Sequence, residues 1–320
     1  MMEQRRLGAA EKQVSALALG GHEYHPDGRL RGFADDLQAA TRPGYRDERF
    51  GGPQRRELVE HALAAGITYF DVTIDPEVHA LGAILAEQGA QPDVVVQMRP
   101  QGMCYGYEEG NPGLADRDRL FREVERLLAL SGRPAIDVLN FGFEAPALRD
   151  RSYLDRVGGN IAELKRQGLI RWAACDSLVS GEEHYLTVME AGCFDVLWVT
   201  FGLLDPLPAE RLFPAAQRLG LGIAVREAFG KGLLFQIAQA AGIPAGLVAG
   251  AAQRWVLAHD AVSTMVVGAR DATQMTANIT AVSSALSEAD KEIVSRLQAE
   301  PEFTSALRER SAGFRAVPAN

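Results

Sequence analysis

The chain has 320 residues, 47% of them hydrophobic, and a net charge of −9. This length and hydrophobic content suffice for one large core, and parallel α/β barrels commonly reach this size as a single domain. The acidic balance, without any run of basic residues, argues against a nucleic-acid-binding protein.

The cysteines and the hydropathy pattern indicate where we expect the protein to work. The three cysteines are widely spaced and odd in number, which is typical of reduced thiols and gives no metal-binding spacing. The sequence contains no apolar leader segment and no long uncharged apolar stretch. We therefore expect a cytoplasmic protein that acts on a small molecule, without a metal site or a membrane partner. Its oligomeric state stays open.

Short apolar segments alternate with helical patterns along the chain, as in parallel βαβ units. Glycines at 66, 168 and 220 each separate an expected helix from the next strand, where a C′ glycine is favoured. Eight such units predict a (β/α)8 TIM barrel over residues 1–320. The expected strands are Val14–Leu19, Thr68–Asp71, Val94–Gln97, Val138–Phe141, Ile170–Cys175, Val196–Thr200, Gly222–Val225 and Thr264–Val267, and the clearest helices are Gln54–Ala65, Arg117–Leu130, Tyr153–Gln167 and Pro244–Ala258.

Two segments are too long to be simple connections. His22–Gly52 follows the first expected strand, and Pro100–Asp116 follows the third. Both therefore fall at the carboxyl ends of strands, which is the face where TIM barrels build their active sites. We expect these loops to cover the active site and to select the substrate.

The last expected strand ends in a turn that carries polar side chains. Asp271 can cap the helix that follows the turn, and Gln274 and Asn278 lie four residues apart on one face of that helix. A guanidinium and two amides at a helix N-terminus suit a phosphate or a nucleotide edge. From these residues alone, Arg270, Gln274 and Asn278 fit either such an anion site or a capped barrel helix with a surface arginine.

This turn also carries a family resemblance. The pattern GAR-x3-Q-x3-N over 268–278 resembles the segment that binds the 2′-phosphate and adenine of the cofactor in aldo-keto reductases. Ala251–Leu257 resembles the helix before that segment, and the likeness extends from Arg6–Gly8 through Val14–Gly21 to Ala281. It implies a TIM barrel and an NADP(H)-dependent oxidoreductase. The residue before the asparagine is usually acidic in the family, but here it is Ala277.

Other parts of the chain resemble the rest of the family's cofactor site. Ile223–Leu234 is similar to the segment that wraps the pyrophosphate, Phe201 falls where a tyrosine stacks on the nicotinamide, and Asp176-Ser177 replaces a Ser-Asn pair that holds the carboxamide. A carboxylate in that pair would favour the oxidised, positively charged ring. The resemblance assigns cofactor binding to Ser177, Phe201, Arg226, Gly232, Leu233, Gly268, Arg270, Gln274 and Asn278.

The catalytic residues of the family are mostly replaced. The family uses a tyrosine as proton donor, tuned by an aspartate and a lysine, with a histidine that orients the substrate. Asp71 matches the aspartate, but the tyrosine position holds Pro76 or Ile74, depending on the direction of counting. Arg99 occupies the position of the lysine, and Gly142 occupies that of the histidine. These replacements predict a non-standard site.

Charged residues at the expected strand ends are the candidates for the new site. Arg99 cannot shuttle a proton, but its planar fork suits a carboxylate or a phosphate, so we expect a polar, anionic substrate. Glu144 can act as an acid or a base if burial raises its pKa. Tyr24, Tyr105 or Tyr107 can supply a displaced phenol from the long loops. The predicted catalytic residues are Asp71, Arg99, Glu144 and Asp176.

Three classes of function remain open. The retained cofactor segments favour an NADP(H)-binding oxidoreductase with a new acid-base group. The missing tyrosine leaves a redox-neutral lyase or epimerase and a catalytically inactive nucleotide-sensing protein as alternatives. A Schiff-base aldolase is disfavoured because the only lysine near that face is Lys231, in the predicted phosphate loop. A metal hydrolase is disfavoured because His22 and His25 have no third histidine at another strand end.

Overall fold

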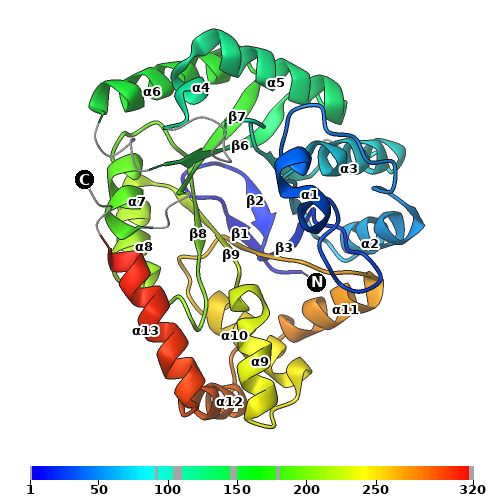
Figure 1. Cartoon of the computed structure of the whole chain (residues 1–320), viewed down its shortest axis with the longest axis vertical. Helices are drawn as coiled ribbons and strands as arrows, with labels where there is room; N and C mark the ends of the chain where they lie inside the picture. The colour runs from blue at the N-terminus through cyan, green and yellow to red at the C-terminus, as the bar shows by residue number, and fades with distance from the viewer. Residues whose placement is uncertain (1, 91–92, 104–109, 145–149, 178–180, 317–320) are drawn as a thin grey trace.

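Eight parallel strands close into a barrel (Figure 1). The computed structural model describes residues 2–90, 93–103, 110–144, 150–177 and 181–316. The strand order around the barrel is β10-β3-β4-β5-β6-β7-β8-β9, which confirms the predicted (β/α)8 architecture. The strands are β3 (Leu17–Gly20), β4 (Tyr69–Asp71), β5 (Val95–Met98), β6 (Ile136–Phe143), β7 (Ile170–Ser177), β8 (Val196–Thr200), β9 (Gly222–Arg226) and β10 (Thr264–Val267).

Helices surround the barrel and begin and end close to the predicted residues. Gly66, Gly168 and Gly220 have φ values of +87°, +72° and +75°, so each ends a helix in the left-handed region that favours glycine. The helices that alternate with the strands are α2 (Pro53–Ala64), α3 (Asp75–Glu87), α5 (Arg117–Ser131), α6 (Arg151–Arg166), α7 (Glu182–Met189), α8 (Pro208–Leu219), α9 (Leu233–Ala240), α10 (Ala245–Leu257) and α11 (Ala272–Ala281).

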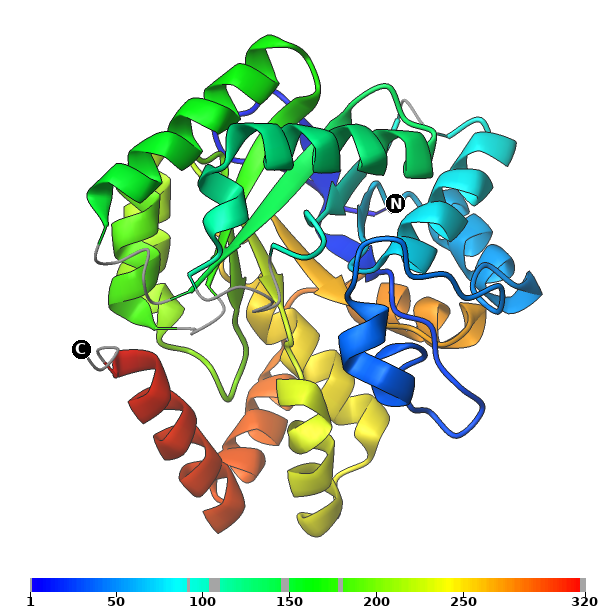
Figure 2. The same cartoon turned by 45° about the horizontal axis from the view of Figure 1, so that its top comes forward.

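The chain ends in two further helices, α12 (Glu288–Gln298) and α13 (Pro301–Arg315). The helix α13 leads from α12 along the outside of the molecule toward α7 (Figures 1 and 2). The nearby carboxylate of Asp205 accepts hydrogen bonds from the Arg310 guanidinium at 2.8 Å, which ties α13 to the segment after β8. Among the described residues, no helix has the length and apolar character needed to cross a membrane.

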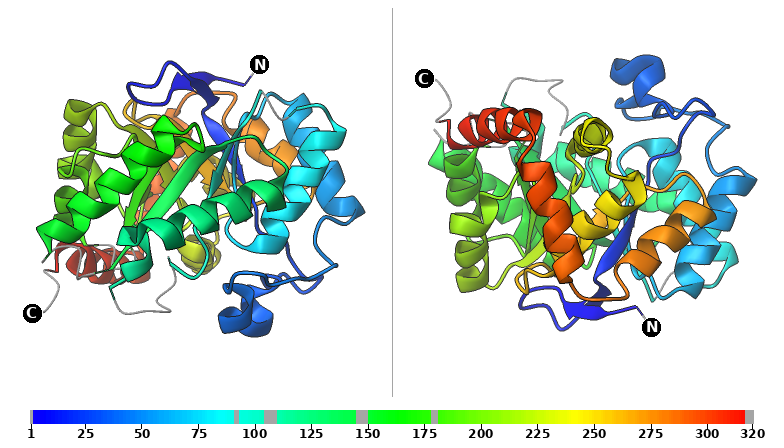
Figure 3. Two further views of the ribbon diagram at one scale, coloured as in Figure 1. Left: turned by 90° about the horizontal axis from the view of Figure 1, so that it is seen from above. Right: turned by 90° about the horizontal axis from the view of Figure 1, so that it is seen from below.

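The predicted strand Val14–Leu19 is wrong as a single element. Its first part forms β2 (Gln13–Ser15), which pairs antiparallel with β1 (Gln4–Arg6), and only its second part enters the barrel as β3. The chain changes direction at Ser15, whose hydroxyl donates to the Leu17 carbonyl oxygen at 2.6 Å. This hairpin covers the end of the barrel opposite to α1 (Phe33–Ala40) and α13, as Figure 3 shows.

Side chains alternate between the inside and the outside of the barrel along each strand. In β8, Val196 and Trp198 belong to the small cluster inside the barrel, whereas Leu197 and Val199 belong to the main core between strands and helices. This is the period of two that a strand imposes. A polar side chain on a strand therefore points into the barrel only if it lies an even number of residues from another inward-facing residue of that strand.

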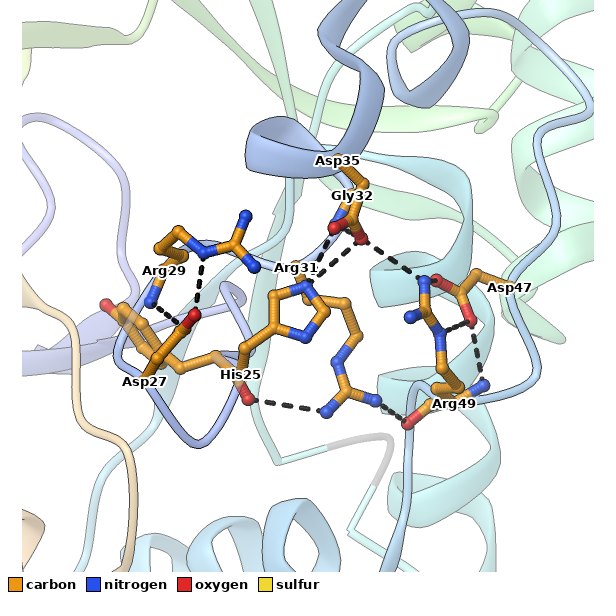
Figure 4. A network of polar contacts seen from close by, with 9 residues as sticks. His25, Asp27, Arg29, Arg31, Gly32, Asp35, Asp47 and Arg49 are labelled. Atoms are coloured by element: carbon orange, nitrogen blue, oxygen red, sulfur yellow. Dashed lines mark hydrogen bonds and ion pairs between the residues drawn. The ribbon is translucent and has the colours of Figure 1, made fainter.

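The segment after β3 is held by its own ion pairs. It contains the short helix α1, and His25 and Arg49 bridge Asp35, while Arg49 also pairs with Asp47 at 2.6 Å (Figure 4). The Arg31 guanidinium donates to the Arg49 carbonyl oxygen at 2.6 Å. These contacts give the segment a defined shape beside the carboxyl ends of the strands.

The segment 100–116 is described only in part. Residues 110–116 include the helical turn α4 (Pro112–Ala115). Tyr105 and Tyr107, two of the phenol candidates, lie outside the described residues.

Two helical glycines test the close packing of the helical layer. A Cβ on Gly82 of α3 would lie 2.3 Å from the Ser131 carbonyl oxygen at the end of α5, whereas a Cβ on Gly159 of α6 would meet nothing within 4 Å. We expect Gly82→Ala to lower the free energy of unfolding by about 1–3 kcal/mol, because the two helices must separate. Gly159→Ala should raise it by about 0.5–1 kcal/mol through helix propensity. Urea denaturation of both variants measures the two free energies of unfolding. Equal changes relative to the wild type would contradict the prediction.

Candidate active site

A cavity of about 640 Å³ opens at the carboxyl ends of the strands. It reaches from the ends of β4 and β5 across β8 to the β9–α9 connection and the end of β10. Polar side chains from four strands line it: Asp71, Arg99, Trp198 and Arg226. Its volume lies within the usual range for small-molecule and cofactor sites.

Asp71 and Arg99 form the first of two buried ion pairs in this cavity. The Arg99 guanidinium donates to the Asp71 carboxylate at 2.7 Å, and the Gln97 amide donates to the same oxygen at 2.7 Å. Tyr69 in turn donates to the Gln97 amide oxygen at 2.8 Å. This chain of hydrogen bonds fixes the Asp71 carboxylate, and the structure thus brings together two of the predicted catalytic residues.

Asp176 and Arg226 form the second buried ion pair. Both terminal nitrogens of Arg226 donate to the Asp176 carboxylate, each at 3.0 Å, in the bidentate arrangement that a guanidinium favours. Burial raises the pKa of the Asp176 carboxyl, and the nearby guanidinium groups of Arg226 and Arg99 oppose this shift. The predicted cofactor ligand Arg226 is therefore a partner of the predicted catalytic residue Asp176.

Trp198 stands between the two arginines and was missed from the sequence. Its ring centroid lies 5.3 Å from the Arg99 guanidinium carbon and 5.9 Å from that of Arg226. Both distances allow cation–π attraction. The buried indole N–H has no hydrogen-bond acceptor within the described part of the chain. Trp198 is two residues after the inward-facing Val196, so the strand alternation could have identified it.

His22 and Glu77 form a further polar pair at the wall of the cavity. The His22 Nδ1 atom lies 2.9 Å from the Glu77 carboxylate, which also accepts the Thr73 backbone N–H at 2.7 Å. Burial lowers the pKa of His22, but the charge and hydrogen bond of Glu77 outweigh it, so the net pKa is raised. Burial raises the pKa of Glu77, but His22 and the Thr73 amide outweigh it, so the net pKa is lowered.

The predicted stacking role of Phe201 is wrong. Its ring is fully buried, 5.2 Å from the Trp255 ring and 4.7 Å from the Phe213 ring. Phe201 continues the outward positions Leu197 and Val199, so it faces the helices and not the barrel interior. Trp198, in contrast, lines the cavity, as do the aromatic residues Tyr24, Phe33, Phe229 and Phe235.

Ser177 and Glu144 have partners outside the main cavity. The buried Ser177 hydroxyl is hydrogen-bonded to His184 Nδ1 at 2.7 Å and thus faces α7. The Glu144 carboxylate accepts the Gly110 backbone N–H at 2.8 Å, and Glu144 is not among the described residues that line the cavity. Glu144 thus contacts the segment before α4, whereas Asp71, Arg99 and the Asp176 partner Arg226 line the main cavity.

The predicted cofactor residues after β9 and β10 are divided between two cavities. Gly232 and Gly268 line the main cavity, and Leu233 begins α9 beside Gly232. Arg270 lines a second, smaller cavity. A Cβ on Gly268 would lie 2.6 Å from the Tyr24 hydroxyl oxygen, so a larger residue at this position would displace the Tyr24 hydroxyl. Tyr24 lines both cavities.

Gln274 and Asn278 are both engaged within the protein. The Gln274 amide oxygen accepts the Arg270 backbone N–H at 2.8 Å, and Asp271 caps α11 as predicted. The Asn278 amide oxygen accepts from the buried Gln253 at 3.0 Å and joins α11 to α10. These two side chains shape the turn that presents Arg270.

Solved structures share this architecture. The chain aligns with the holo form of the aldo-keto reductase AKR11C1 from Bacillus halodurans at a TM-score of 0.67 and 21% sequence identity, over 93% of this chain and 96% of that chain. The apo form aligns over the same shares at a TM-score of 0.66 and 19% identity. The chain has an aldo-keto reductase-like fold. No protein-family model matches the sequence, and a search of curated proteins finds no relative.

The His22–Glu77 pair predicts a specific pH dependence of stability. Because the pKa of His22 is raised above 6.5 and that of Glu77 is lowered below 4.5, the pair stabilises the fold most between these two values. Its contribution falls at lower pH as Glu77 binds a proton, and at higher pH as His22 loses one. The melting temperatures of wild type and His22→Gln should therefore differ most at about pH 5–6.5.

The control for this comparison is His79→Gln, because His79 is exposed on α3, the helix that also carries Glu77. We expect its melting temperature to follow that of the wild type at every pH. A difference between wild type and His22→Gln that is independent of pH would contradict an ion pair.

Proposed function

We propose that this protein is an NADP(H)-binding oxidoreductase that acts on a small, polar substrate with an anionic group. The observation that carries the proposal is the single cavity that extends from the two buried ion pairs to the β9–α9 connection and Gly268. An extended dinucleotide needs such a path across the carboxyl ends of the strands. The aldo-keto reductase-like fold supports the same class of reaction.

The lining of the cavity fits a nicotinamide dinucleotide. Gly232 adds no side chain to the path, the Tyr24 hydroxyl lies against Gly268, and the Trp198 ring offers an aromatic surface. When bound, the cofactor would supply or accept the hydride, and Gly232, Gly268 and Arg270 would hold its phosphates and adenosine.

The two arginines would hold the anionic group of the substrate. Both guanidinium groups line the same cavity beside the Trp198 ring, and each is held by one carboxylate. Asp71 and Asp176 keep these guanidinium groups in position. A carboxylate or phosphate of the substrate is the matching group, because guanidinium recognises both in a planar, bidentate manner.

His22 is our candidate for the group that replaces the missing tyrosine. It lines the cavity, its side chain is 36% exposed, and Glu77 holds its imidazole by the Nδ1 atom. The raised pKa favours the protonated imidazole, which can give a proton from Nε2 to a substrate oxygen. In the oxidation direction the neutral imidazole would accept the same proton.

Cofactor titration tests the proposed function first. We expect NADPH to bind and to change the tryptophan fluorescence, because Trp198 lines the cavity. Trp198→Phe should lose most of this change, whereas Trp172→Phe, nearer the amino end of β7, should keep it. Calorimetry with NADPH and NADH gives the affinities. If neither cofactor binds, the proposed function is wrong.

Turnover of short 2-oxo acids, and of acids that carry an aldehyde group, tests whether Arg99 holds the anionic group of the substrate. We expect Arg99→Met to raise KM by about 10²-fold or more, because a buried charge pair with the substrate is lost. Arg117→Met is the matched control, since Arg117 is a surface residue that packs on Phe121. An unchanged KM in Arg99→Met would remove Arg99 from substrate binding.

The same assays separate the oxidoreductase from the redox-neutral alternative. The buried, arginine-paired Asp176 carboxyl has a raised pKa and is a possible base for an epimerase or a lyase. Such an enzyme would bind the cofactor tightly and convert substrate without net oxidation or reduction of the nicotinamide. Oxidation of NADPH in step with loss of substrate would favour the oxidoreductase.

A further inference from the structure

A second cavity, of about 250 Å³, lies beside the main one and shares His22 and Tyr24 with it. The N-terminus of α2 forms one side of this cavity, and the segment after β3 and the turn after β10 form the rest. Glu23 is the only carboxylate among its described lining residues. The cavity is lined by four arginines: Arg31, Arg49, Arg55 and Arg270.

Arg55 is the most informative of these residues. It is 5% exposed, and its guanidinium makes one hydrogen bond, to the Gly20 carbonyl oxygen at 3.2 Å. No carboxylate of the described chain lies within ion-pair distance of it. Burial lowers the pKa of the guanidinium, and the more distant charges of Glu23 and Glu77 oppose this shift. The other Arg55 nitrogens have no acceptor in the described part of the chain. They are not closed off from solvent, so they can donate to a ligand in the cavity. A buried, unpaired charge is costly unless a ligand compensates it.

The backbone next to Arg55 offers further donors. The helix α2 has 12 residues, and no side chain caps its N-terminus. Pro53 occupies the first helical position, and the N–H groups of Gln54 and Arg55 follow it at the cavity. Uncapped N–H groups and the positive end of the helix dipole favour an anion at this point.

The other charges leave this end of the cavity positive. Asp47 and Asp35 neutralise Arg49. The Glu23 carboxylate accepts the uncharged Gly51 backbone N–H at 2.8 Å, so its single negative charge offsets only part of the charge of Arg31, Arg55 and Arg270. The Arg31 guanidinium donates to two backbone carbonyl oxygens, which carry no net charge, and its Nε atom is buried without a partner. The Arg270 guanidinium has no ion-pair partner within the described structure.

We propose that this cavity binds the dianionic phosphate of a phosphomonoester, held by Arg55, Arg270 and Arg31 and by the N-terminal amides of α2. A phosphate has enough oxygens to accept from several guanidinium groups and from backbone N–H groups at once. The phosphate has two possible sources. It is either the 2′-phosphate of NADP(H), in which case the inference rests on the proposed function, or the phosphate of a separate small molecule.

The test is calorimetric titration with inorganic phosphate, NADP⁺ and NAD⁺ of the wild type and three variants. The variants are Arg55→Gln, Arg270→Gln and, as matched control, Arg56→Gln, whose side chain on the same helix pairs with Glu87. We expect phosphate to bind to wild type and Arg56→Gln alike, and at least about tenfold more weakly to the other two variants. Phosphate binding that is absent, or unaffected in both Arg55→Gln and Arg270→Gln, would overturn the proposal.

The melting temperature without ligand separates a binding residue from a structural one. Arg55→Gln removes an unpaired buried charge, so its melting temperature should equal or exceed that of the wild type. Phosphate should raise the melting temperature of the wild type and have little effect on the variant. A large fall in the ligand-free variant, with an undiminished response to phosphate, would identify Arg55 as structural and reject the site.

The dinucleotides identify the source of the phosphate. Weaker binding of NADP⁺ but not of NAD⁺ to Arg55→Gln supports the site and assigns it to the 2′-phosphate. Arg55-dependent phosphate binding with equal affinities for both dinucleotides supports the site and assigns it to a separate phosphomonoester. Arg55-dependent phosphate binding in a protein that binds neither dinucleotide retains this inference and rejects the proposed function.

Discussion

The candidate active site depends on the burial of two carboxylate–guanidinium pairs at the carboxyl ends of the strands. Removing such charges from water costs several kcal/mol per ion, so each charge is stable there only with its partner. Asp71 and Arg99 extend from adjacent strands, and Asp176 and Arg226 from strands separated by β8. Trp198 of β8 fills the space between the arginines. The cavity floor is therefore fixed before any ligand arrives.

Positive charge is concentrated on a protein that is acidic overall. The net charge is −9, yet arginines line both cavities at the carboxyl face. In a recess, guanidinium groups act on a ligand through a medium that screens them less than bulk water does. An anionic ligand is therefore attracted at short range, even though the protein carries a net negative charge.

The sequence predicted the strands well because β-branched runs and C′ glycines are local signals. It also placed Asp71, Arg99 and Asp176 at the ends of apolar runs, and in the structure they lie at the carboxyl ends of β4, β5 and β7. Phe201 was misplaced because the alignment to a family tyrosine ignored the alternation of β8, and the same alternation would have revealed Trp198. Two further pairs of residues could be recognised only in the folded structure.

His22 and Glu77 belong to separate elements, and so do Arg55 and Arg270. No pattern within one segment brings such residues together, because their proximity arises only when the barrel closes. Strand ends can be inferred one by one, whereas cavities between neighbouring loops depend on the three-dimensional arrangement of the whole barrel.

The pairing of β3 with β10 also constrains how the chain can fold. Leu17 pairs with Met265, so the contact that closes the barrel joins segments about three quarters of the chain length apart. Contacts of such sequence separation form late, because a long loop must first be closed. During synthesis β3 is made long before β10, so the edge of β3 that will pair with β10 stays unpaired until then. The hairpin β1–β2, which precedes β3, can form early from local contacts alone.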